Sequence, residues 1–371
     1  MDDLLAIPEP ARRLTRITPL LSVGPLGCHL KLESLQRTGS FKLRGAALKL
    51  ARLSPLERLA GVVAASAGNH GLGVACAARA FGLHARVVVP VGAPRIKREG
   101  ISQFGAEVLQ RGETYDEAER TARALALRRD AIFISPFDDT DIIEGNGIWL
   151  AQEILVQRPG LRQIVIPIGG GGLAAGLCTE MAAHGVRVVG VQPRVNCAMM
   201  ESLRQGRALV EYHGGKTLCE GLEGAVGWRN FRAVRQHIDR IELVEEEQVV
   251  GAVVYAFRKL GLVVEASAAV VVAAVLSGQV STSADTVLVI TGGNIDQEVL
   301  DAWLAGGGLA PRAPSATPAA SDGLAAAAAP PALSEEEAAL LASARTPPAV
   351  SAPATPANED PASAKTPPAS R

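Results

Sequence analysis

Short runs rich in valine and isoleucine alternate with longer runs rich in alanine and leucine from Leu20 to about Gly308. The short runs are almost entirely apolar and are bounded by glycine, proline or polar residues, which is typical of strands buried on both faces of a parallel sheet. The pattern therefore predicts an α/β fold. The expected strands are 61–65, 85–89, 131–135, 163–168, 187–191 and 286–290, and the expected helices between them include 71–80 and 173–183.

The composition changes sharply after Gly308. Residues 311–371 hold more than half of the chain's 23 prolines, many alanines and almost no β-branched or aromatic residues, so we expect this tail to be disordered. Within it, Ser334 and Glu337 have the spacing of a capping box ahead of an apolar face. This spacing permits a short helix over 335–344, which would be either transient or partner-binding.

Overall composition narrows the class of partner. The 37 basic and 38 acidic side chains nearly cancel, so the chain lacks the charge excess of a nucleic-acid or membrane-surface binder. The apolar run 268–276 is too short to span a bilayer, and the acidic amino terminus does not resemble a signal or transit peptide. We therefore expect a cytoplasmic protein that binds small molecules or itself, with no nucleic acid and no membrane as partner.

The cysteines and histidines do not suggest a metal centre. The five cysteines are scattered without a CxxC pair, and the six histidines form no HxxxH or HxH pair. Structural zinc sites bring such residues together at short, regular spacings. We therefore expect no metal site and five reduced cysteines.

Four consecutive glycines between an apolar strand and a helix form the strongest local signal for a binding site. They are Gly169, Gly170, Gly171 and Gly172. Glycines let several backbone N–H groups turn to one side, and the helix adds the positive end of its dipole, so the segment predicts a seat for a phosphate. Gly170, Gly172 and Ala175 also satisfy the G-x-G-x-x-G/A fingerprint of dinucleotide-binding proteins, but Gln192 stands about where that motif needs an acidic residue. A nicotinamide or flavin nucleotide remains an alternative at this point.

Two further turns follow predicted strands. In SAGNHG, Ser66, Asn69 and nearby N–H groups can hold a carboxylate, and the Asn69 amide can also donate to a ring oxygen. In TGGN, Thr291 carries a hydroxyl that can donate to a neutral ring nitrogen. Because α/β sheets bind ligands at the carboxyl ends of their strands, we expect the three turns to share one crevice.

A single lysine stands among small and apolar residues in the segment TGSFKLRGA. Lys42 lies between Phe41 and Leu43, so burial of its amine is expected. A desolvated lysine has a lowered pKa and becomes a nucleophile. The alternative is a solvated lysine at the start of a helix that runs through Leu50.

Taken in order, TGSFKLRGA, SAGNHG, the glycine run and TGGN resemble the fold-type II pyridoxal-phosphate enzymes, and among them the serine/threonine dehydratase branch. The resemblance covers roughly residues 10–305. It implies pyridoxal 5'-phosphate as cofactor, and two open, twisted, mainly parallel sheets flanked by helices, as in tryptophan synthase β. It also implies a homodimer. The implied division of the chain is a large cofactor-binding domain of residues 1–53 and 139–308, a small domain of 54–138, and the tail of 309–371.

The resemblance also implies roles for individual residues. Lys42 corresponds to the lysine that holds the cofactor as a Schiff base, and Phe41 lies beside the ring. Asn69 corresponds to the partner of the ring hydroxyl, and Thr291 to the residue against the pyridine nitrogen. The four glycines correspond to the phosphate cup. The implied substrate-binding segment is Ser66, Ala67, Gly68, Asn69 and His70.

The activity implied is the elimination of water from a β-hydroxy amino acid, L-threonine or L-serine, to give a 2-oxo acid and ammonia. Serine racemases carry a second serine where this chain has Ala67, so efficient racemisation is not expected. The carboxylates that bind a divalent cation in some relatives are replaced by Gln192 and Ala198. Alternatives are a lyase for another β-substituted amino acid, a nucleotide-dependent oxidoreductase, and a protein that holds the cofactor without turnover.

Two more segments resemble family positions near the site. Glu220 and Gly221 align with residues that border the cofactor, although a surface turn fits them equally well. Glu265 stands at the start of a very apolar helix, where we expect its carboxyl to face polar groups of the crevice. The proline that usually follows is Ala266 here, so substrate recognition is expected to differ in detail.

Overall fold

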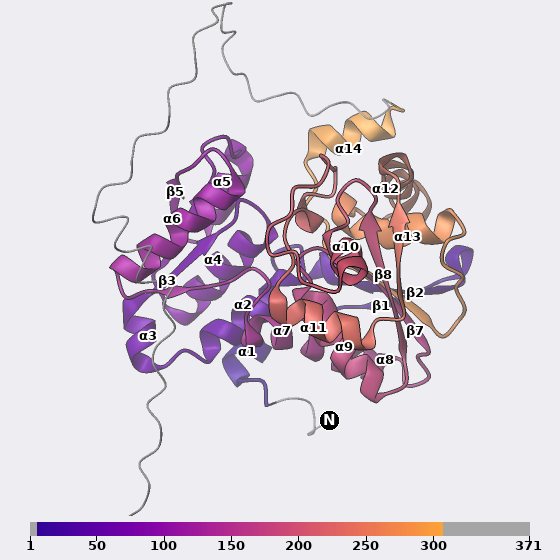
Figure 1. Ribbon diagram of the computed structural model, residues 1–371, viewed down its shortest axis with the longest axis horizontal. Helices are drawn as coiled ribbons and strands as arrows, with labels where there is room; N and C mark the ends of the chain where they lie inside the picture. Colours follow the sequence, from indigo (N-terminus) through magenta and orange to yellow (C-terminus); the bar gives the residue numbers. More distant parts are fainter. Residues whose placement is uncertain (1–5, 307–371) are drawn as a thin grey trace, which may run out of the picture. The chain divides into compact units, whose positions relative to one another are not determined.

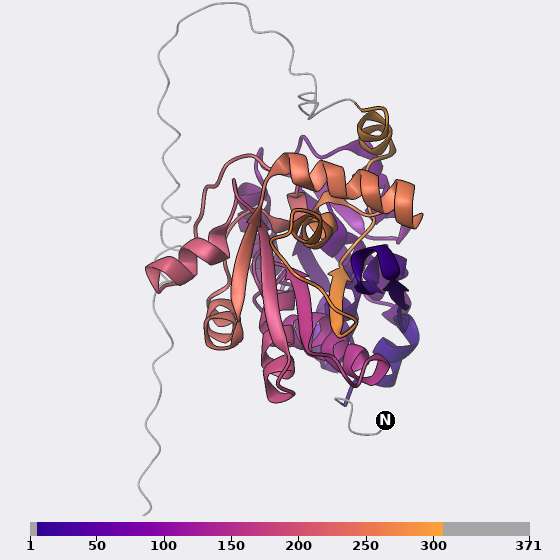
Figure 2. The ribbon, with the colours of Figure 1, turned by 90° about the vertical axis from the view of Figure 1, so that its right-hand side faces the viewer.

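Two β-sheets organise the part of the chain that the computed structural model describes, residues 6–306 (Figure 1). The larger sheet has six strands, which are parallel to their neighbours except for the antiparallel first pair. Figures 1 and 2 both show its central strands running side by side. Their spatial order is β1 (Leu20–Val23), β2 (Cys28–Leu32), β10 (Thr286–Ile290), β7 (Gln163–Pro167), β8 (Arg187–Pro193) and β9 (Arg240–Val244).

The smaller sheet has four strands, all parallel, and every one of them comes from residues 62–133. Their spatial order is β5 (Glu107–Gln110), β4 (Ala85–Val89), β3 (Val62–Ala65) and β6 (Ile132–Phe133). The prediction of an α/β fold with two mainly parallel sheets is therefore confirmed.

Helices connect and cover the strands of both sheets. The first group is α1 (Glu9–Leu14), α2 (Lys42–Ala51), α3 (Pro55–Ala60), α4 (Asn69–Phe81), α5 (Arg95–Gln103), α6 (Tyr115–Arg128), α7 (Thr140–Ile143) and α8 (Trp149–Gln157). The second group is α9 (Gly172–Ala183), α10 (Ala198–Gln205), α11 (Trp228–His237), α12 (Glu246–Leu260), α13 (Ala266–Leu276) and α14 (Gln297–Leu304). Among the helices of residues 6–306, none is both long and apolar enough to cross a bilayer.

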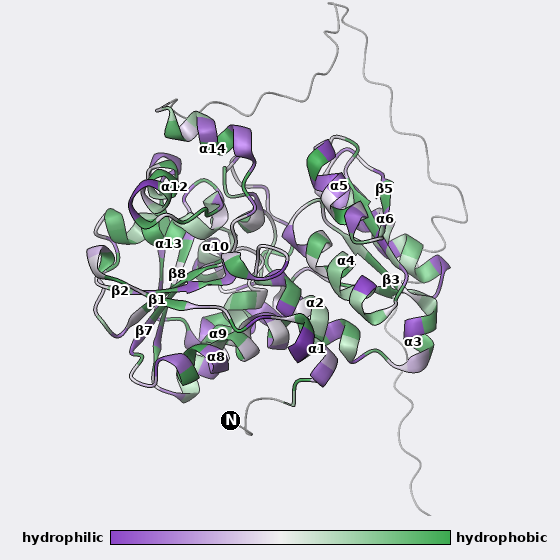
Figure 3. Cartoon of the chain, turned by 180° about the vertical axis from the view of Figure 1, so that it is seen from behind, coloured by the Kyte–Doolittle hydropathy of each residue, from purple (hydrophilic) through white to green (hydrophobic). Residues whose placement is uncertain are grey.

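Helices cover both faces of the large sheet, and successive residues of a strand point to opposite faces. In β7, Val165 packs into the core formed with α12 and α13, whereas Ile164 and Ile166 pack into the core formed with α8, α9 and α11. Helix α13 consists almost entirely of alanine and valine and is largely green in the hydropathy view (Figure 3). An element that is apolar all round must lie inside, which is where α13 is found.

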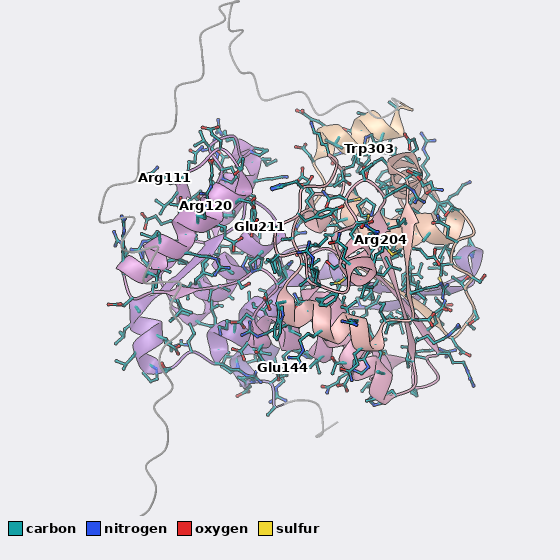
Figure 4. All side chains as sticks on the ribbon, viewed as in Figure 1. Arg111, Arg120, Glu144, Arg204, Glu211 and Trp303 are labelled. Atoms are coloured by element: carbon teal, nitrogen blue, oxygen red, sulfur yellow. The ribbon has the colours of Figure 1, made fainter. Side chains whose placement is uncertain are left out.

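Helix α2 is fixed to the segment that follows the smaller sheet by ion pairs on its outer side. Arg52 pairs with Asp141 at 2.7 Å and with Glu144 at 2.5 Å, and Glu144 is labelled in Figure 4. Lys49 pairs with Asp139 at 2.9 Å. Because α2 begins at Lys42, these contacts help to set the position of that lysine.

Most predicted strands are found within two residues of their expected ends, although the strand expected at 131–135 is reduced to β6. Four strands escaped prediction: β1, β2, β5 and β9. Each has polar or exposed positions, as in the partly exposed β5 (Glu107–Gln110) at the edge of its sheet, so none is the all-apolar run that the prediction sought. The helix expected over 335–344 and the tail of 309–371 lie outside the described residues.

Candidate active site

The segment that carries Lys42 is attached by its backbone to the turn that follows β10. The Phe41 N–H donates to the Thr291 carbonyl at 3.0 Å, and the Gly293 N–H donates to the Gly39 carbonyl at 2.9 Å. Ser40 and Gly292 form an isolated antiparallel bridge between the two segments. The structure thus brings together the TGSFK and TGGN motifs, which are some 250 residues apart in the sequence.

The Lys42 amine has one hydrogen-bond partner in the described part of the chain. Its Nζ donates to the Pro136 carbonyl oxygen at 2.7 Å and lies 5.3 Å from the centre of the Phe41 ring. Burial lowers the pKa of this amine to about 8, and the nearby Glu265 carboxylate opposes that shift. The amine is therefore deprotonated far more readily than an ordinary surface lysine, as expected of a nucleophile or base.

The SAGNHG turn lies between β3 and α4. The Ser66 hydroxyl accepts a hydrogen bond from the Gly68 N–H at 3.1 Å, and Asn69 is the first residue of α4. The Asn69 amide donates to both Glu265 oxygens, at 2.8 and 3.0 Å, and its own oxygen accepts from Asn294 Nδ2 at 2.7 Å. Asn69 therefore links this turn to the TGGN turn and to the start of α13.

The Glu265 carboxyl lies in this network, as its sequence position suggested. Burial raises the pKa of Glu265 to about 7, and the hydrogen bonds from Asn69 oppose part of that shift. A carboxyl with such a pKa changes its protonation near neutral pH.

His70 lies below the turn and is buried. Its Nε2 is 3.0 Å from the Ile134 carbonyl oxygen, and its Nδ1 has no partner in the described part of the chain. Burial, followed by the charge of Lys42, lowers the pKa of His70 to about 3. The imidazole is therefore neutral at physiological pH, with Nε2 as the protonated nitrogen facing the carbonyl.

The glycine run follows β7 and leads directly into α9, as predicted. Gly171 is the N-cap of α9 and has a φ of +91°, a conformation that favours glycine. A Cβ atom on Gly170 would lie 2.6 Å from the Phe137 ring, and one on Gly172 would lie 2.7 Å from the Phe137 carbonyl oxygen. Side chains are excluded here, so the backbone itself forms the surface of the loop.

The backbone N–H groups of this run have no protein partner. Within residues 6–306, none of the N–H groups of Gly169, Gly170, Gly171 and Gly172 donates a hydrogen bond to a protein atom. Four adjacent free donors at the positive end of a helix match the acceptor oxygens of a phosphate group. This cradle fits the phosphate of pyridoxal 5'-phosphate.

The segment after β6 lies between the lysine and the glycine run. Pro136 accepts the hydrogen bond from Lys42, while Phe137 packs against Gly170 and Gly172. Neither residue was predicted from the sequence, because a backbone carbonyl carries no local sequence signal. Gly221, which was predicted, places its carbonyl oxygen 2.9 Å from the Cβ position of Gly169 and so borders the run.

Thr291, Glu220 and Gln192 were also singled out from the sequence. Thr291 directly follows β10 and is 4% exposed, and within the described residues its hydroxyl makes no hydrogen bond. Glu220 forms an ion pair with Lys97 of α5.

Gln192 is buried, donates to the Ile168 carbonyl at 3.0 Å and accepts from the Met200 N–H at 2.9 Å. Both ends of its amide are therefore paired with the backbone.

The fold and the site together define an enzyme of the pyridoxal-phosphate class. Residues 5–292 match the family model described as pyridoxal-phosphate dependent enzyme. The chain belongs to this family, and its cofactor is pyridoxal 5'-phosphate. The alternative of a nucleotide-dependent oxidoreductase thereby loses its basis.

Similar proteins of known name narrow the branch. The L-threonine ammonia-lyase of Thermotoga maritima is 40% identical over 276 residues, which is 74% of this chain and 68% of that protein. The processed form of threonine deaminase isoform 2 from Solanum lycopersicum has a TM-score of 0.76 and 32% identity, covering 82% of this chain and 87% of that one. Serine racemase from Dictyostelium discoideum has a TM-score of 0.73 and 29% identity, covering 80% and 98%.

Proposed function

We propose that this chain is an ammonia-lyase that eliminates water from L-threonine or L-serine and releases ammonia and a 2-oxo acid. The single observation that carries the proposal is the Lys42 amine, which has a pKa lowered to about 8 and is joined through Pro136 and Phe137 to a phosphate cradle. The names of the similar threonine enzymes support the choice of substrate.

Lys42 is the proposed base. A lysine with a pKa of about 8 is partly neutral at physiological pH and can remove the α-proton of a bound amino acid. The bound cofactor supplies an electron sink for the charge that this leaves on the α-carbon. The β-hydroxyl then leaves and takes up a proton, so that the α-hydrogen and the hydroxyl are lost in total as one molecule of water. The resulting enamine then takes up one water molecule, which yields the 2-oxo acid and ammonium.

The other residues of the site bind and orient. The four glycines would hold the phosphate of the cofactor, and Thr291 would face its pyridine nitrogen with a hydroxyl. A hydroxyl there stabilises charge on the ring less than a carboxylate does, which favours prompt loss of the β-hydroxyl. Ser66 and Gly68, ahead of the positive end of α4, would receive the substrate carboxylate.

Ala67 argues for elimination over racemisation. A racemase needs a second proton-carrying group on the face of the substrate opposite the lysine. The methyl side chain of Ala67 carries no exchangeable proton. We therefore propose elimination as the main reaction, although a serine racemase is among the similar structures.

The domain division expected from the sequence is also part of the proposal. All four strands of the smaller sheet come from residues 62–133, which supports a small domain of 54–138 within a large domain of 1–53 and 139–308. We further propose that the chain works in the cytoplasm. The homodimer that the family resemblance implies is part of the same proposal.

The test is the release of 2-oxobutyrate from L-threonine by the purified full chain with added pyridoxal 5'-phosphate, followed together with ammonia. Equal amounts of both products, and their loss in Lys42→Ala, are the expected result. A protein that binds the cofactor but releases no product from threonine or serine would contradict the choice of substrate. The assay would then be repeated with other β-substituted amino acids, and continued inactivity would favour a cofactor-binding protein without turnover.

A further inference from the structure

One buried polar side chain next to the cofactor site has no role in the function proposed above. Asn230 lies in the first turn of α11 and is fully buried between Phe137 and the glycine run. Its Oδ1 has no hydrogen-bond partner in the described part of the chain. A buried hydrogen-bond acceptor without a partner destabilises the folded state. The hydrogen bonds of the amide nitrogen, Nδ2, should therefore explain why an asparagine stands here.

The other end of the amide joins two segments of the site. Asn230 Nδ2 donates to the Gly170 carbonyl oxygen at 2.8 Å and to the Phe137 carbonyl oxygen at 3.2 Å. The Gly227 N–H also donates to the Gly170 carbonyl, at 3.1 Å. The Cβ position of Gly171 lies 2.9 Å from Asn230 Cβ, so the side chain is also packed against the next residue of the run.

These hydrogen bonds orient the peptide group between Gly170 and Gly171. In a trans peptide the N–H points opposite to the carbonyl. When Asn230 and Gly227 hold the Gly170 carbonyl on their side, the Gly171 N–H is directed to the opposite side of the loop. That N–H is one of the four free donors of the cradle.

The second hydrogen bond of Asn230 holds Phe137, the residue that follows the acceptor of the Lys42 amine. Phe137 follows Pro136, and the Pro136 carbonyl accepts the hydrogen bond from Lys42. Asn230 therefore couples the phosphate cradle to the acceptor of the lysine, two parts of the site that no direct hydrogen bond joins among the described residues.

We propose that Asn230 is a positioning residue for cofactor binding, which aims the Gly171 N–H at the phosphate and fixes the cradle relative to Lys42. This proposal rests on the proposed assignment of the glycine run to the phosphate. Asn230 acts through the backbone and does not itself touch the cofactor.

The test compares two probes that differ only in the phosphate, pyridoxal 5'-phosphate and pyridoxal, by equilibrium dialysis with the purified full chain. In Asn230→Ala, the affinity for pyridoxal 5'-phosphate is expected to fall about ten- to a hundredfold, the range known for residues that orient the ligands of a bound metal ion. The affinity for pyridoxal is expected to stay within about twofold, since pyridoxal makes no use of the cradle. The phosphorus NMR signal of the bound cofactor should shift in the same variant.

The matched control is Asn196→Ala. Asn196 is also a buried asparagine, 5% exposed, whose Nδ2 donates to a backbone carbonyl, that of Gly215, at 3.1 Å. Its contacts do not include the glycine run or Phe137. If the loss of any buried amide were enough, both variants would bind both probes more weakly. The proposal instead predicts that only Asn230→Ala loses affinity, and only for pyridoxal 5'-phosphate.

Each outcome decides the question. An equal loss of affinity for the two probes in Asn230→Ala, or no loss of affinity for either, would overturn the role of Asn230. If the unaltered chain binds both probes equally well, the assignment of the glycine run to the phosphate is wrong, and the proposal falls with it. Should the alanine variant fail to fold, Asn230→Ser keeps one donor, and the same selective loss is expected in weaker form.

Discussion

Lys31 is a buried lysine and Lys42 a partly buried one, and they differ in how completely their amines are paired. The Lys31 amine donates to the Thr18 carbonyl at 2.8 Å, to Gln157 Oε1 at 2.7 Å and to the Glu153 carboxylate. Within residues 6–306, the Lys42 amine has a single acceptor, the Pro136 carbonyl. Burial lowers the pKa of both amines, and a carboxylate opposes part of the shift in each case, Glu153 at Lys31 and Glu265 at Lys42. The comparison suggests that full pairing marks a structural lysine, and incomplete pairing a reactive one.

Lys31 belongs to a paired-charge cluster, defined here as Lys31, Glu33, Arg44 and Glu153. The Arg44 guanidinium is fully buried, contacts Glu33 through two nitrogens at 2.7 and 2.8 Å, and contacts Glu153 at 2.9 Å. Two positive and two negative groups thus neutralise one another. The cluster joins β2, α2 and α8, so it holds the helix that begins at Lys42.

The largest expected effect is a loss of activity when Lys42 is replaced and a loss of stability when Lys31 is replaced. Lys42→Ala should lower kcat for the elimination about a thousandfold or more, since a positioned base contributes on that order. Its free energy of unfolding should change little, because the desolvation cost of the amine, which the variant removes, offsets the packing lost with the side chain. Lys31→Met should do the reverse, losing stability while each folded molecule keeps its activity. Enzyme assays combined with urea unfolding measure both quantities, and a stable but inactive Lys31→Met would break the comparison.

The next effect tests the cluster itself. Arg44→Met leaves Glu33 and Glu153 buried without their main partner, and removal of one member of a buried ion pair costs about 3–5 kcal/mol. Urea unfolding of the apoprotein should show this loss. The matched control is Arg13→Met, which removes an exposed ion pair with Glu9 on α1 and should leave stability nearly unchanged. Equal losses in the two variants would mean that the cluster is not a main source of stability.

The difference between the two regions also shows what the sequence could reveal. The three turns of the site were predictable because glycine, serine and asparagine stand at strand ends, where local chemistry is informative. The paired-charge cluster was not, because Lys31 and Glu153 lie 122 positions apart and only the fold joins them. Lys31 also interrupts the apolar pattern of β2, so that strand went unpredicted.

Asn230 and Pro136 mark the limit of sequence reasoning at the site. Pro136 acts through a backbone carbonyl, which every residue has. Asn230 left one weak signal, since it is a polar residue on the same buried face of α11 as Phe231 and Val234. Such a residue indicates a buried hydrogen bond but does not name its partner.

A smaller effect is expected within the cradle. Gly171→Ala forces a side chain into a left-handed conformation and brings its Cβ within 2.7 Å of Met199 Cε. The strain should cost about 1–3 kcal/mol and weaken the binding of pyridoxal 5'-phosphate. Gly185→Ala is the control, because Gly185 has a φ of +67° but its Cβ position meets no atom of residues 6–306 within 4 Å. If both variants bind the cofactor equally well, the loop tolerates side chains, and the cradle is less tightly defined than the comparison requires.

The last effect concerns Glu265, the incompletely paired acid of the site. Its pKa is raised by burial from 4.5 to about 7, so between these values the folded state binds more protons than the unfolded state. The stability of the apoprotein should therefore fall as the pH rises from about 4.5 to 7, and Glu265→Gln should lack this part of the pH dependence. Urea unfolding at pH 5 and pH 8 measures the difference. Above pH 7, Glu265→Gln should be at least as stable as the unaltered chain, because it no longer buries a charge.

Glu153→Gln supplies the opposite case for the same measurement. The pKa of Glu153 is lowered, because Arg44 and Lys31 outweigh its burial, so its charge stabilises the folded state above its ordinary pKa. This variant should be less stable than the unaltered chain at pH 8 and should differ less from it as the pH falls through the lowered pKa. If Glu265→Gln and Glu153→Gln showed the same dependence on pH, the distinction between reactive and structural charges would fail for the acids, even if it held for the two lysines.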